Sequence, residues 1–93
     1  MKFVSLSSGS SGNCYYIETK STKLLIDAGI STRRIKNELA KLQVDVADLD
    51  GVCITHEHID HVYGIDVLSR TYQIPIYANV LTARRIFENG HMK

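Results

Sequence analysis

The alternation of apolar and polar runs predicts a chain that switches repeatedly between strands and helices. Short runs rich in β-branched and aromatic residues, bounded by glycine, serine or charged residues, predict strands. Such runs occupy residues 2–6, 14–19, 22–27, 52–55 and 76–78. Leu24, Leu25 and Ile26 follow one another without alternation, so we expect both faces of that strand to be covered.

Apolar residues at helical spacing predict helices over residues 32–43 and 60–72, and capping residues predict a third helix over residues 80–88. Ser31 and Asn79 are suited to cap the first and last of these helices, and Gly90 suits the position after the last. Residues 45–51 are interpreted as a polar connection. The resulting order predicts an α/β (α+β) fold in which helices cover a sheet.

Composition narrows the class of protein. The 93 residues suit one small domain, residues 1–93, and 44% hydrophobic content argues against disorder. A net charge of +1 argues against a strongly basic nucleic-acid-coating protein, although a nucleic-acid substrate held at a metal site remains possible. The basic residues Arg33, Arg34 and Lys36 are interpreted as a solvated helix face, with nucleic-acid contact as the alternative.

The N-terminal residues and the lengths of the apolar runs indicate the cellular compartment of the protein. No apolar signal segment follows Met1, and no run approaches the roughly 20 apolar residues of a membrane span. We therefore expect a cytoplasmic protein without membrane contact. Cys14 and Cys53 are too few for a disulfide scaffold and are expected to be small buried hydrophobes.

A serine- and glycine-rich loop, SSGSSGN, separates the first two predicted strands. It matches neither the GxGxxG nor the Walker pattern, so it is only a weak signal for a phosphate-binding loop. Its backbone N–H groups can nevertheless face an anion. We take Ser10, Ser11, Gly12 and Asn13 as a possible substrate loop.

The strongest chemical signal is ITHEHIDH, residues 54–61, directly after a predicted buried strand. Ligand sites in open α/β sheets lie beyond the carboxyl ends of strands. The zincin motif HExxH fails because position 60 is aspartate, and zinc-finger patterns fail because the two cysteines are far apart. The pattern that remains is H-x-H-x-D-H.

The spacing of this cluster predicts binding of two divalent cations. His56 and His58 are two positions apart on an extended loop, so both can reach one cation. Asp60 and His61, at the start of the next helix, can hold a second cation nearby. Imidazole with a carboxylate favours zinc, with manganese or iron as alternatives. Such a pair can supply a metal-bound hydroxide at neutral pH, with Asp60 as the catalytic base.

Two neighbouring carboxylates have other interpretations. Glu57 faces away from the histidine pair and is expected to be structural or solvent-facing. Asp27 ends another strand, where it either orients a ligand histidine or caps backbone N–H groups of a turn, and the sequence leaves both open.

THEHIDH, the LLIDAG strand end about thirty residues earlier, and SLSSGSSGNCYYI together resemble the metallo-β-lactamase superfamily, and within it the YycJ/VicX/WalJ group. The resemblance implies an αββα sandwich, a dinuclear metal centre and hydrolysis of a phosphodiester or related bond. It implies that His56 and His58 bind the first metal, Asp60 and His61 the second, and that Asp27 supports them.

The resemblance also implies parts that are not recognisable here. Such proteins are typically more than twice as long, and their second half supplies another histidine, a bridging aspartate, a final histidine and a second sheet. We therefore expect the N-terminal half of a sandwich, which needs the remaining half of the domain or a second chain to complete its site, and which exposes an apolar sheet face.

Three functions follow as hypotheses. The first is a metal-dependent phosphodiesterase, a 5′-3′ exonuclease acting on single-stranded DNA. The second is a metallo-hydrolase of a thioester or lactam, because the same activated water attacks either bond. The third, favoured for these residues alone, is a non-catalytic fragment or binding module with little turnover.

Overall fold

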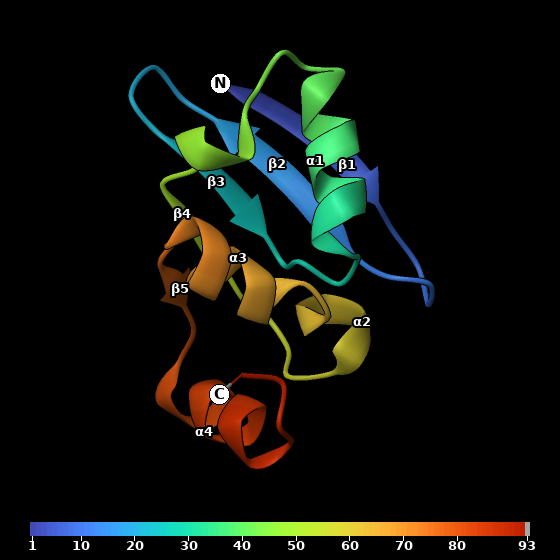
Figure 1. Cartoon of the computed structure of the whole chain (residues 1–93), viewed down its shortest axis with the longest axis vertical. Helices are drawn as coiled ribbons and strands as arrows, with labels where there is room; N and C mark the ends of the chain where they lie inside the picture. The colour runs from blue at the N-terminus through green and yellow to red at the C-terminus, as the bar shows by residue number, and fades with distance from the viewer. Residues whose placement is uncertain (93) are drawn as a thin grey trace.

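The computed structural model describes residues 1–92, which form one five-stranded sheet with helices packed against it (Figure 1). The strands lie in sequence order: β1 (Lys2–Ser7), β2 (Cys14–Glu18), β3 (Lys23–Ile26), β4 (Gly51–Cys53) and β5 (Ile76–Tyr77). The pairs β1–β2 and β2–β3 are antiparallel, whereas β3–β4 and β4–β5 are parallel. Every predicted strand is present, and the mixed α/β class is confirmed.

One face of the sheet forms the core. The strand register aligns one residue from each strand in a single row: Val4, Tyr16, Leu25, Val52 and Ile76. Helices α1 (Thr32–Ala40) and α3 (Ile65–Tyr72) cover this face (Figure 1). They contribute fully buried side chains at helical spacing: Ile35, Leu39, Ile65 and Leu68. Burial of this apolar surface is the main force that holds the elements together.

The opposite face differs from the prediction. Leu25 is buried, but Leu24 and Ile26 are only half-buried. On the same open face, Phe3 is 61% exposed and stacks on Tyr15, and Tyr77 is 55% exposed. The prediction that both faces of β3 are covered is therefore wrong for residues 1–92, because the helices covering the sheet pack on the other side.

The predicted helix over residues 60–72 is broken in two. Helix α2 (Ile59–Val62) is separated from α3 at Gly64, whose N–H donates to the carbonyl oxygen of Ala28 at 2.7 Å. A Cβ at Gly64 would lie 2.5 Å from the carbonyl oxygen of Ile30. The apolar stripe was correctly predicted, but this close backbone approach interrupts the helix.

Other boundaries agree more closely. Helix α4 (Val80–Glu88) has the predicted limits, and Asn79 Oδ1 accepts from the N–H of Thr82 at 2.8 Å. Helix α1 is capped by Ser31 as predicted but ends at Ala40. The stretch 45–51 includes the 3₁₀ helix η1 (Val46–Asp48) and buries Val46 and Leu49, so it is not simply polar.

The helices formed by residues 1–92 are all too short or too polar to cross a membrane.

Gly29 provides a test of the packing between the β3–α1 connection and α2. Its N–H donates to the carbonyl oxygen of Asn13 at 2.8 Å, and a Cβ there would overlap the carbonyl oxygen of Asp60. Because rigid backbone must move, we expect Gly29→Ala to lower the free energy of unfolding by about 3 kcal/mol. Urea denaturation measures this change.

Gly90→Ala is the control, because nothing lies within 4 Å of a Cβ at that site. Its positive φ of 77° predicts a smaller loss of about 1 kcal/mol. Equal losses at the two positions would contradict the packing described for Gly29.

Candidate metal centre

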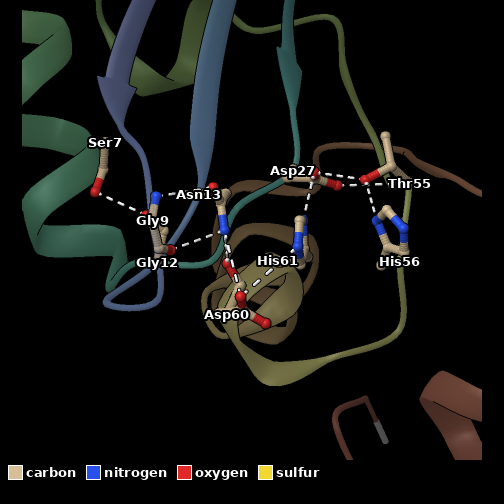
Figure 2. Close-up of polar contacts among 9 residues, drawn as sticks. All are labelled: Ser7, Gly9, Gly12, Asn13, Asp27, Thr55, His56, Asp60 and His61. Carbon is tan, nitrogen blue, oxygen red and sulfur yellow. Dashed lines mark hydrogen bonds and ion pairs between the residues drawn. The ribbon is translucent and has the colours of Figure 1, made fainter.

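The candidate site is built around Asp27, which directly follows β3 and is only 2% exposed. Its Oδ1 accepts from the backbone N–H of Thr55 at 2.8 Å. Its Oδ2 accepts from the Thr55 hydroxyl at 2.7 Å and lies 2.7 Å from His61 Nδ1 (Figure 2). A buried carboxylate is tolerated only when it is hydrogen-bonded in this way. Asp27 thus joins the ends of β3 and β4 to α2.

These hydrogen bonds assign the tautomer of two imidazoles. A carboxylate can only accept, so His61 carries its proton on Nδ1 and keeps the Nε2 lone pair available. Thr55 uses its hydroxyl proton toward Asp27, so its oxygen accepts from His56 Nδ1 at 2.9 Å. The His56 and His61 rings lie 4.8 Å apart between centroids. One carboxylate thereby leaves both Nε2 atoms available as metal donors.

Asp60 is positioned by the serine- and glycine-rich loop. Its carbonyl oxygen accepts from the N–H of Asn13 at 2.7 Å and from Asn13 Nδ2 at 3.2 Å. Its Oδ2 lies 3.4 Å from Asn13 Nδ2 and 3.7 Å from His61 Nε2. The Asn13 carboxamide also exchanges two hydrogen bonds with the backbone of Gly9. Asn13 therefore fastens the loop to α2 (Figure 2).

The other members of the predicted substrate loop are Ser10, Ser11 and Gly12. Ser10 and Ser11 are exposed and line a pocket beside Asp60. Gly12 is buried with φ 132°, and a Cβ there would lie 2.5 Å from the carbonyl oxygen of Gly29. Gly12 therefore allows the loop to pack closely on the β3–α1 connection.

His58 lies apart from the Asp27 network. Its side chain is exposed and, among residues 1–92, makes no hydrogen bond; its ring centroid is 6.2 Å from that of His56. Glu57 instead accepts from Arg85 Nη1 of α4 at 3.0 Å. A hydrogen bond from its own backbone N–H, and then Arg85, lower the pKa of Glu57. Glu57 ties the loop to α4, in agreement with the structural role expected for it.

Cys14 is close to this network without contributing a metal ligand. Burial, together with the negative charge of Asp27, raises the pKa of its thiol to about 12. The thiol therefore stays protonated at neutral pH, whereas metal binding requires the thiolate. Cys14 is the buried small hydrophobe that the sequence predicted.

The donors present fit a divalent cation in chemistry but fall short in number. His56, His61 and Asp60 lie around one end of the sheet, and two imidazoles with a carboxylate suit zinc and related metals. In the part of the chain that the structure describes, no group of three or more His, Cys, Asp or Glu side chains is arranged to hold a metal ion. The site thus presents oriented donors without closing a coordination shell.

Two contacts of this site were not foreseen from the sequence. Thr55 links Asp27 to His56, and Asn13 holds Asp60. The position of Thr55 between a buried strand and the first histidine was an available signal, since strand ends position site residues. The contact of Asn13 with Asp60 joins residues 47 positions apart, which spacing cannot reveal.

The mixed sheet carries a histidine- and aspartate-bearing loop directly after β4. Residues 8–93 match the metallo-beta-lactamase superfamily, and the chain belongs to this superfamily. The resemblance found in the sequence is confirmed.

The chain is similar to particular members of this superfamily. The chain is 49% identical over 81 residues to exodeoxyribonuclease WalJ of Streptococcus pneumoniae, covering 87% of this chain and 30% of that protein. It is 42% identical over 82 residues to exodeoxyribonuclease YycJ of Bacillus anthracis, covering 88% and 31%. A B3 metallo-beta-lactamase with an active-site glutamic acid superposes with a TM-score of 0.73 at 28% identity, covering 83% of this chain and 30% of that one.

The chain therefore spans about 30% of the length of these relatives.

Thr55 offers a direct test of the hydrogen-bond relay. Thr55→Val keeps the shape of the side chain but removes the hydroxyl that joins Asp27 to His56. Because the lost bond involves a carboxylate, we expect a loss of about 1.5 kcal/mol in the free energy of unfolding. Urea denaturation measures this loss, and NMR of the imidazole nitrogens follows the release of His56.

Thr55→Ser is the matched control, since it retains the hydroxyl. We expect it to keep the His56 signals of the unmodified chain and most of the stability. Equal changes in the Val and Ser variants would show that the hydroxyl plays no part.

Proposed function

We propose that the protein is a metal-dependent phosphodiesterase that degrades single-stranded DNA from its 5′ end. The observation that carries the proposal is the pair of imidazoles, His56 and His61, which the buried carboxylate of Asp27 holds through Thr55 and directly. Both Nε2 atoms are left available, and that of His61 lies 3.7 Å from Asp60 Oδ2. The identity to two proteins named exodeoxyribonucleases supports DNA as the substrate.

In this proposal each residue of the cluster has a role, and Asp60 has two. His56 and His58 hold one divalent cation, and Asp60 and His61 hold a second. Zinc is favoured, and manganese or iron are the alternatives. Cations held by these residues would neutralise charge on the phosphodiester and would make a water more acidic. Asp60 accepts the proton of the attacking water, and Asp27 keeps His61 in the metal-binding tautomer.

The count of donors implies further contributors. Two cations that each take about four ligands need more than the four side chains available here. We propose that additional donors come from another part of the domain or from a second chain. Residues 1–93 by themselves then bind metal weakly and turn over little substrate.

A second candidate function is hydrolysis of a lactam or thioester. The likeness to a B3 metallo-beta-lactamase favours it, and the cluster itself does not select between electrophiles. Substrate assays separate the two candidates.

The experiment compares the native protein with two histidine variants. Loaded with Zn²⁺ or Mn²⁺, and with the proposed additional donors present, the native protein should shorten 5′-phosphorylated single-stranded DNA and leave thioester and lactam substrates intact. We expect His58→Ala to lower the rate by about 100-fold, because even residues that only support a ligand contribute 10–100-fold. Metal content, measured on the same samples, should fall with it.

His91→Ala is the control, because His91 lies outside the cluster, after α4. It should retain both metal and activity. Full DNA hydrolysis by His58→Ala, or a native protein that binds no divalent cation, would reject the proposal. Hydrolysis of only the thioester or lactam would favour the second candidate.

A further inference from the structure

A pocket of about 340 Å³ opens beside Asp60, between the serine- and glycine-rich loop, the start of α1 and α2. No histidine lines it, so Asp60 is the residue that it shares with the candidate metal centre. Its size is at the lower end of small-molecule sites, which run from about 300 to 1,000 Å³. It can therefore hold one small unit of a substrate bound at Asp60.

Part of the pocket lining is suited to a phosphate. Arg34 of α1 lines it, and its guanidinium makes no ion pair with any residue between 1 and 92. Ser10 and Ser11 line the same pocket, and their hydroxyls have no partner within that range. Arginine with adjacent hydroxyl donors is a recurrent arrangement for phosphate oxygens.

Arg34 differs from its basic neighbour Arg33 because it lines the pocket. Arg33 is exposed on the same helix but does not line this pocket. Arg33, Arg34 and Lys36 are all exposed, as expected for a solvated helix face, and Arg34 in addition lines the pocket.

The pocket lining also includes apolar, exposed side chains. Ile59 of α2 and Tyr63, which directly follows α2, line the pocket and are 52% and 60% exposed. The Tyr63 hydroxyl has no partner among residues 1–92. An exposed aromatic ring beside an aliphatic side chain is a stacking platform for an unpaired base, and such stacking tolerates any base.

We propose that this pocket is a nucleotide subsite for single-stranded nucleic acid. A base stacks on Tyr63 against Ile59, and its phosphate lies between Arg34 and the hydroxyls of Ser10 and Ser11. The next phosphodiester of the strand then lies at Asp60. Duplex binds poorly, because a paired base cannot turn onto Tyr63. The position of the scissile bond rests on the proposed function, whereas binding in the pocket does not.

The test is fluorescence anisotropy with a 3′-labelled oligothymidylate in EDTA, where no hydrolysis occurs. Arg34→Ala should weaken binding and lower the slope of log K against log salt by about 0.7, the value for one phosphate contact on a single strand. Arg33→Ala, the matched control, should leave that slope unchanged. Circular dichroism checks that both variants are folded.

Tyr63 is tested in the same assay. Tyr63→Ala should weaken binding about fivefold or more, the range measured for loss of one stacked base, whereas Tyr63→Phe should bind normally. The corresponding duplex should bind more weakly than the single strand to the unmodified chain.

Several outcomes would overturn the subsite: no binding to the unmodified chain, equal effects of Arg33→Ala and Arg34→Ala, normal binding by Tyr63→Ala, or duplex bound as tightly as single strand. The subsite and the proposed function fail separately. If the variants weaken binding but the native protein hydrolyses no phosphodiester, the function falls and the subsite stands. If the native protein hydrolyses DNA but all variants bind normally, the proposed function stands and the subsite is rejected.

Discussion

The buried carboxylate of Asp27 is the constraint on which the candidate site depends. Removing a charge from water is costly unless hydrogen bonds compensate, and Asp27 accepts from Thr55 twice and from His61. Its φ of 61° is unusual for a residue other than glycine and persists only where the surroundings fix it. The ends of β3 and β4 and the start of α2 are therefore held in one arrangement.

The chemistry of the loop follows from this arrangement. One branch from Asp27 reaches His61 directly, and the other reaches His56 through Thr55. Asn13 independently fixes Asp60, which links the serine- and glycine-rich loop to the cluster. Rings held by such outer contacts lose little freedom when they bind a metal, and orientation of this kind raises metal affinity. The pocket next to Asp60 shares the same supporting loop.

The sequence predicted the elements with local signals and missed the features that depend on distant contacts. Asn79 and Gly90 marked both ends of α4, and strand composition located all the strands. The break at Gly64 depends on the backbone of Ala28, so helical periodicity alone could not predict it. Similarly, the apolar run in β3 indicated that its residues have apolar surroundings, but not which face of the sheet the helices cover. The sequence left open whether Asp27 orients a histidine or caps a backbone N–H, and it contacts both His61 and the N–H of Thr55.

The central claim is that Asp27 sets the tautomer of the candidate metal-binding histidines. Long-range ¹H–¹⁵N NMR of the metal-free chain, at an alkaline pH where imidazoles are neutral, tests it most directly. The account predicts that His56 and His61 carry their protons on Nδ1, and that Asp27→Asn, whose amide can donate, moves the His61 proton to Nε2. A proton on Nε2 of His61 in the unmodified chain, or no change in Asp27→Asn, would contradict it.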